Sequence, residues 1–82
     1  MKLNGRGYVL ADNNMRLDDA MLLIERALAM DPKSVHIQDS YGWVNFRLGN
    51  MEVARNYLEM AWGKEPLAEV AAHLADVYYE LG

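Results

Sequence analysis

Apolar residues recur along this chain at steps of three and four, which is the period of an amphipathic α-helix. One such stripe runs through Ile37, Tyr41, Val44 and Leu48, and another follows at Met51, Ala54, Leu58 and Ala61. Similar stripes precede and follow these two. The pattern predicts an all-α chain of five helices, over roughly 3–13, 17–30, 34–48, 51–64 and 67–81, and no strand.

The ends of the predicted helices carry residues that suit helix termini. Gly49 fits the left-handed conformation that commonly closes a helix, and the side chain of Asn50 is suited to cap the helix after it. Pro32 disfavours helical geometry in the residue before it, so the second helix should end near Asp31. Ser34 is suited to cap the third helix.

The chain repeats itself with a period of about 34 residues. At this offset Ala20 matches Ala54, Ile24 matches Leu58, Ala27 matches Ala61 and Pro32 matches Pro66. A period of roughly 20–50 residues is typical of a solenoid, in which each unit packs on its neighbours. Gly42 stands inside a predicted helix at a cost of about 1 kcal/mol relative to alanine. We therefore expect that a Cβ at Gly42 would clash with a packed neighbour.

The repeating unit resembles the tetratricopeptide repeat (TPR), a helix-turn-helix with small residues at fixed places and a proline at its end. The second unit supplies Gly42, Ala54, Leu58, Ala61 and Pro66 at those places, and the first supplies Gly7, Ala20, Ile24, Ala27 and Pro32. Two positions depart from the family pattern: Gln38 stands where tryptophan is frequent, and Asn45 stands where tyrosine is frequent. The resemblance implies an α-α superhelix with one repeat over 1–33, a second over 34–66 and a half repeat over 67–82, as a fragment of a longer TPR protein.

Composition and charge exclude several classes of function. The chain has 82 residues, a net charge of -4 and no cysteine, so disulfides and thiolate metal sites are excluded. The acidic balance argues against a nucleic-acid binder, which needs a basic face, and against electrostatic docking on an anionic membrane. No apolar run approaches the roughly 18 residues of a membrane-spanning helix.

Three groups of residues suggest chemistry, and in each case a structural interpretation is stronger. His36 and Ser40 share a helix face, as a base and a nucleophile would, but no third group accompanies them. A second face carries Glu69, His73 and Asp76, which could hold a metal but fit a solvated polar stripe better. The methionines could suggest an adaptable binding surface, but Met21, Met30, Met51 and Met60 lie within or beside helical stripes and are expected to fill gaps in the core. The sequence therefore predicts neither an enzyme nor a cofactor or metal site.

The resemblance to TPR proteins also implies a binding surface, because the first helix of each TPR unit lines a concave groove. Carried onto this chain, the groove residues are Tyr8, Asp12, His36, Asp39, Trp43, Phe46, Arg47, Asp76 and Tyr79. The groove is thus acidic and aromatic and favours a basic or apolar-aromatic segment of a protein partner. We expect Trp43 and Tyr79 to be exposed. Phe46 could lie either in the groove or in the core. A narrower resemblance, to the C-terminal repeats of proteobacterial TPR lipoproteins of the cell envelope, implies an adaptor in the periplasm or at the outer membrane, with the cytoplasm left open.

The alternative is a structural module that associates with itself. Ala71, Ala75 and Tyr78 widen the apolar stripe of the last predicted helix, on the side where a further helix would pack. Exposed apolar surface of this kind usually marks an interaction site, and identical chains most commonly associate as two-fold symmetric dimers. We therefore expect the chain to self-associate, as a two-fold dimer, through Ala71, Ala75 and Tyr78 of its last helix.

Overall fold

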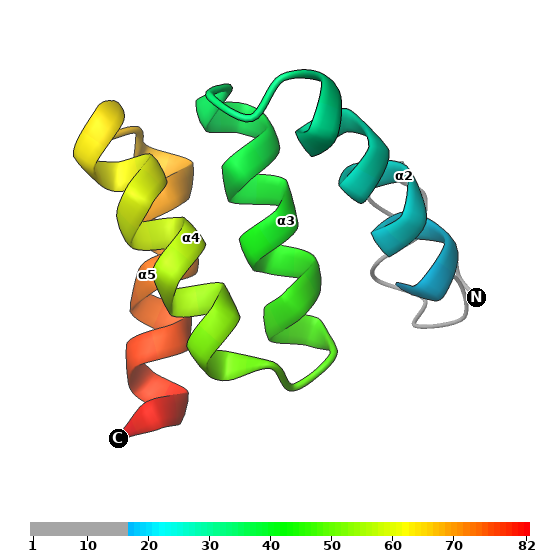
Figure 1. The fold of residues 1–82 in the computed structure, drawn as a ribbon. Helices are drawn as coiled ribbons and strands as arrows, with labels where there is room; N and C mark the ends of the chain where they lie inside the picture. The colour runs from blue at the N-terminus through cyan, green and yellow to red at the C-terminus, as the bar shows by residue number, and fades with distance from the viewer. Residues whose placement is uncertain (1–16) are drawn as a thin grey trace.

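A computed structural model describes residues 17–82, which form four helices and contain no strand. The helices are α2 (Leu17–Met30), α3 (Val35–Arg47), α4 (Met51–Lys64) and α5 (Ala68–Leu81). Each begins and ends within one residue of its prediction from the sequence. The helix expected over 3–13 lies outside the described residues. In Figure 1, α3 stands between α2 and α4, and α5 runs behind α4.

The predicted caps are confirmed at two places and wrong at a third. The hydroxyl of Ser34 accepts a hydrogen bond from the backbone N–H of Ile37 at 3.3 Å, which caps α3. Gly49 has a φ of 90°, the left-handed conformation expected after α3. Asn50 does not cap α4 with its side chain. Its amide Nδ2 instead donates to Oδ1 of Asn45 at 3.0 Å, because that buried side chain lies within reach.

The close approach of α3 and α4 explains the glycine in the middle of α3. A Cβ added at Gly42 would lie 2.7 Å from Cγ of Leu58 and 3.3 Å from the backbone oxygen of Ala54. Leu58 is fully buried, so it has little freedom to give way. The expected clash is therefore confirmed, and Gly42 sets how closely the two helices of this unit pack.

The core lies mainly between α4 and α5. Its buried members are Ala54, Leu58, Ala61, Val70, Leu74 and Val77, with Val35, Phe46 and Leu67 packed against it. These residues are the apolar stripes of two consecutive repeat units, so the core joins units as well as the two helices within one. This is the nearest-neighbour arrangement of a repeat protein. No helix within residues 17–82 is both long and apolar enough to cross a membrane.

The two departures from the TPR pattern are both buried polar residues in α3. Gln38 donates from its amide Nε2 to the backbone oxygen of Pro32 at 2.8 Å, which ties α3 to the loop before it. The side-chain amide of Asn45 donates to the backbone oxygen of Tyr41 at 2.9 Å. At both positions, a polar side chain that donates a hydrogen bond to nearby backbone stands where the TPR pattern has a large aromatic residue.

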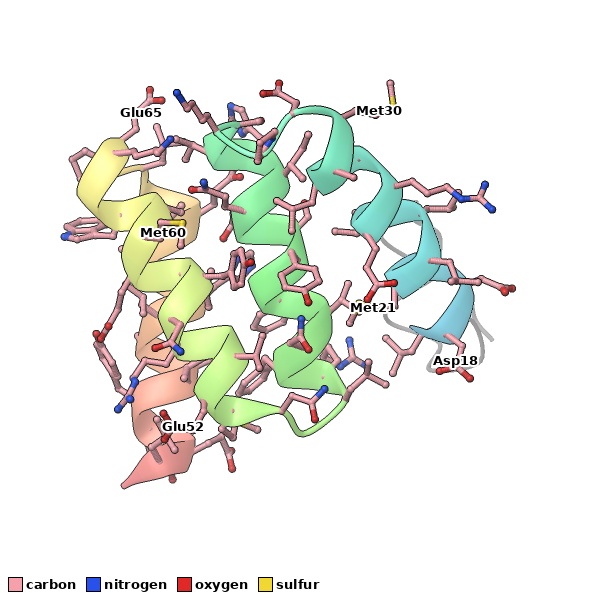
Figure 2. All side chains as sticks on the ribbon, in the orientation of Figure 1. Asp18, Met21, Met30, Glu52, Met60 and Glu65 are labelled. Carbon is pink, nitrogen blue, oxygen red and sulfur yellow. The ribbon has the colours of Figure 1, made fainter. Side chains whose placement is uncertain are left out.

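The expectation that four methionines fill the core is wrong for two of them. Met30 is 86 % exposed and Met60 is 45 % exposed, whereas Met21 and Met51 are half-buried. Figure 2 shows Met30 at the end of α2 with its side chain directed away from the other helices. Met30 is the last residue of α2, and the side chains of Met30 and Met60 face solvent over much of their surface.

Candidate functional site

Helices α3 and α5, which the sequence repeat assigns to successive units, are joined by a partly buried hydrogen bond. Nδ1 of His73 in α5 donates to Oδ1 of Asp39 in α3 at 2.8 Å. The Asp39 side chain is only 5 % exposed and that of His73 is 26 % exposed. A carboxylate that is largely withdrawn from water needs a partner, since leaving it unpaired is costly. His73 is therefore a structural link between the two units.

The same histidine supports an aromatic side chain of α3. The rings of Trp43 and His73 stack with centroids 4.2 Å apart and planes 21° apart. Trp43 also stacks on Phe46, with centroids 4.9 Å apart and planes 18° apart. Trp43 is half-buried, so part of its ring remains open to a ligand while two neighbours hold its orientation. Such a ring offers contact area that is already ordered before binding.

A third contact between the same helices lies near their N-terminal ends. Nδ1 of His36 is 3.7 Å from Oε2 of Glu69, and both side chains are largely exposed. An exposed pair of this length contributes little to stability. The contact indicates where the two side chains lie: His36 and Glu69 are on the surface that also carries Asp39, Trp43 and His73. These five residues define what we call the α3–α5 face.

The remaining predicted groove residues differ in their surroundings. Phe46 is half-buried, packs against the core and stacks on Trp43. Arg47, the last residue of α3, is half-buried. Asp76 and Tyr79, three residues apart on α5, are exposed, and Tyr79 is 83 % exposed. Tyr8 and Asp12 lie outside the described residues.

His73 is the residue that the sequence analysis placed wrongly. It was expected on a solvated polar stripe with Glu69 and Asp76, whereas its ring is bonded to Asp39 and stacked on Trp43. The repeat does not pair these two residues directly: α5 repeats α3 at an offset of 33, whereas Asp39 and His73 are 34 residues apart, so they stand one position out of register. Within residues 17–82, no group of three or more acidic or histidine side chains is arranged to hold a metal ion.

A second surface feature is an apolar hollow between α4 and α5. It has a volume of about 290 Å³ and is lined by Trp62 of α4 and by Ala71, Leu74, Ala75 and Tyr78 of α5. The three residues predicted for self-association thus lie around one depression, which we call the α4–α5 hollow. Two of these lining residues, Trp62 and Tyr78, have 42 % and 47 % of their surface exposed.

One side of this hollow is held by a hydrogen bond across the two helices. The hydroxyl of Tyr78 donates to Oε2 of Glu59 at 2.5 Å. This bond, which only the neutral phenol can donate, raises the pKa of Tyr78 above its ordinary value, and the negative charge of Glu59 acts in the same direction.

Comparison with known proteins gives one relative and supports the repeat interpretation. Over 76 residues, 93 % of this chain, the sequence is 43 % identical to a TPR repeat-containing protein of Pseudomonas aeruginosa. The chain spans only 13 % of the length of that relative. No family model matches the chain, and no solved structure matches it. The named relative, the 34-residue period and the paired helices together support the resemblance of this chain to the tetratricopeptide repeats.

Proposed function

We propose that this chain is a non-catalytic tetratricopeptide segment that binds a segment of a protein partner across the α3–α5 face. The observation that carries the proposal is the position of Trp43, half-buried and stacked on His73, which Asp39 in turn holds. Aromatic rings are frequent hot spots in protein interfaces. An ordered ring is useful for binding because little side-chain freedom is left to lose.

The charges around this face favour a basic or apolar-aromatic partner. Glu69 and Asp76 are exposed carboxylates on α5, and α5 contains no lysine or arginine. Tyr79 adds an exposed ring one turn from Asp76. A lysine or arginine of the partner can therefore meet a carboxylate, while an apolar side chain packs on the rings. The first of these contacts weakens as salt rises.

The narrower role that the sequence suggests is an adaptor of the bacterial cell envelope. Its support is the resemblance of several residue runs to TPR lipoproteins, together with a bacterial relative that carries the TPR name. Within that role the α3–α5 face would capture a client segment and present it to another protein. The proposal for binding at this face does not depend on the compartment.

The binding proposal is tested by titrating the isotope-labelled chain with short peptides of one length and different charge. Three peptides are used, in which phenylalanine alternates with lysine, with serine and with glutamate, respectively. Amide chemical shifts of the chain are followed by NMR. We expect affinity to fall in that order. The shift changes should gather around Trp43, His73 and Asp76. A preference for the glutamate peptide, or changes confined to α2, would contradict the proposal.

A matched pair of charge reversals locates the site. Asp76→Lys on α5 and Glu25→Lys on α2 change the net charge equally, and both residues are exposed. We expect Asp76→Lys to weaken the lysine peptide about 3- to 10-fold, since an exposed charge pair contributes about 0.2–1 kcal/mol and the reversal replaces that attraction by a repulsion of similar size. Glu25→Lys should leave its affinity within about twofold. Equal effects of both variants would mean that only net charge matters.

The alternative function, a structural module that associates with itself, makes a different prediction. It requires a dimer whose formation depends on the α4–α5 hollow, where Ala71, Ala75 and Tyr78 gather. Sedimentation across micromolar concentrations separates the two functions. A monomer is expected for the adaptor. A dimer that Tyr78→Glu dissociates would favour the alternative.

A further inference from the structure

Both histidines of this chain lie on the α3–α5 face, and each meets a carboxylate of the other helix. The sequence contains two histidines, His36 and His73. Nδ1 of His36 in α3 is 3.7 Å from Oε2 of Glu69 in α5. Nδ1 of His73 in α5 is 2.8 Å from Oδ1 of Asp39 in α3. The two pairs therefore link the same two helices in opposite directions, and every imidazole of the protein takes part.

The two imidazoles can gain a proton without losing these contacts. Histidine is the side chain that ordinarily changes charge between about pH 5 and pH 8. Water reaches both rings, because the side chain of His36 is 72 % exposed and that of His73 is 26 % exposed. In each pair Nδ1 is the nitrogen beside the carboxylate, so the added proton can enter at Nε2 while Nδ1 keeps its place.

The added charges would offset much of the negative charge on this face. Besides the two pairs, α3 contributes Arg47, and α5 contributes Asp76 and Glu80. Of the carboxylates of Asp39, Glu69 and Asp76, two stand beside an imidazole. When both imidazoles are charged, a lysine of the partner meets a positive charge at two of these three places. The attraction that favours a basic partner is then weakened at short range.

The charged side chains on the neighbouring helices are of types that ordinarily titrate outside this pH range. Helix α4 packs on α3 and α5, and its charged side chains bond to other groups: Arg55 to Glu52, Glu59 to Tyr78, and Lys64 to the backbone oxygen of Lys33. Helix α2 packs on α3 and carries Asp18, Asp19, Glu25 and Arg26. Within residues 17–82, a change of pH between about 5 and 8 is therefore expected to act through the two histidines.

Protonation of His73 also affects the aromatic ring that carries the proposed binding. The imidazole lies on the indole of Trp43 with centroids 4.2 Å apart and planes 21° apart. A cation over an indole face is attracted by the π electrons of that ring. A charged His73 thus takes up part of the attraction that Trp43 offers to cations, and a lysine of the partner gains less from it. The contact also gives a signal, because a charged imidazole against an indole quenches its fluorescence.

We propose that mild acidification releases a segment bearing lysine or arginine from the α3–α5 face, through protonation of His36 and His73. This inference rests on the proposed function and adds its regulation. Contacts between apolar side chains of the partner and the rings of this face involve no opposing charges. The effect of pH therefore falls on basic partners, while an uncharged apolar-aromatic partner stays bound.

Isothermal titration calorimetry of the chain with two peptides tests this inference. Phenylalanine alternates with lysine in one peptide and with serine in the other. Both peptides are acetylated and amidated, so that neither changes its charge between about pH 5.5 and pH 8. At constant ionic strength we expect the Kd of the lysine peptide to rise about 3- to 10-fold on going from the higher pH to the lower. The Kd of the serine peptide should change by no more than about twofold.

A double variant, His36→Asn with His73→Asn, assigns the pH effect to the two imidazoles. The asparagine Nδ2 can donate from near the position of the histidine Nδ1, but it does not titrate. The quantity compared is the ratio of the Kd values of the lysine peptide at the two pH values, whatever the affinity of the variant itself. We expect this ratio to fall below about twofold in the double variant.

The fluorescence of Trp43 follows the charge of His73 without any ligand. In a Trp62→Phe background, Trp43 is the remaining tryptophan of the chain. We expect its emission to fall as the pH is lowered from about 8 to about 5.5. His73→Asn should abolish this fall, whereas His36→Asn, the matched change at the other histidine, should preserve it.

The outcomes separate this inference from the proposed function. If the lysine peptide does not bind at the higher pH, the proposed function is wrong and the inference falls with it. If the peptide binds equally at both pH values to a chain that circular dichroism shows to be folded, the proposed function stands and the inference is wrong. A ratio of Kd values that survives in the double variant, or an emission of Trp43 that ignores pH, would also overturn it, because other groups would then be responsible.

Discussion

The glycine at position 42 offers the sharpest test of how the two helices of a unit pack. In an exposed helix, replacing glycine by alanine stabilises the protein by about 1 kcal/mol, because alanine loses less backbone entropy. In Gly42→Ala the new methyl group would lie 2.7 Å from Cγ and 3.1 Å from Cδ2 of Leu58. It would also lie 3.3 Å from the backbone oxygen of Ala54, which cannot rotate away.

These two effects oppose each other, and their magnitudes decide the sign. Overpacking a well-packed core costs about 1–3 kcal/mol. The upper part of that range applies here, because Leu58 is fully buried and one of the close atoms belongs to the backbone. After subtraction of the helix propensity gain of about 1 kcal/mol, we expect Gly42→Ala to lower the free energy of unfolding by about 1–2 kcal/mol. For a domain of this size that corresponds to a fall in Tm of roughly 4–16 °C.

Thermal and urea unfolding followed by circular dichroism measure this effect, and the chain offers a matched control. Gly63 lies in α4, and a Cβ added there meets no atom within 4 Å. Gly63→Ala should therefore stabilise the protein by up to about 1 kcal/mol. In a Leu58→Ala background the clash is relieved, so Gly42→Ala should lose its destabilising effect. A Gly42→Ala protein as stable as Gly63→Ala would refute the reasoning.

Three further predictions concern single contacts. Ser34→Ala removes the hydroxyl that accepts from Ile37 and should lower the free energy of unfolding by about 0.5–2 kcal/mol in urea unfolding. Ala61→Leu adds bulk at a fully buried position and should cost about 1–3 kcal/mol, seen as a lower Tm. Glu59→Gln removes the charge beside Tyr78, so the pKa of that phenol should move back toward 10.0, as an absorbance titration will detect. Because the folded pKa is the higher one, the small stability from this bond is present below pH 10.0 and is lost as pH rises through the folded value.

The sequence alone determined the local elements of this protein. The steps of three and four among apolar residues located four helices to within one residue, and Ser34, Pro32 and Gly49 marked their ends. The 34-residue period indicated a repeat protein, and a glycine inside a helix indicated a close helix contact. These signals are readable because each depends on backbone conformation or on spacing along one helix.

Only the tertiary structure decided which polar and large side chains meet. The side chain of Asn50 bonds to the buried amide of Asn45 instead of capping α4, and Met30 is exposed at the end of α2. Most clearly, Asp39 and His73 paired across two repeat units and placed a stacked support beneath Trp43. The rotation and distance between neighbouring helices determine such contacts. Those quantities follow from the packing of many side chains at once, so no local run of residues expresses them.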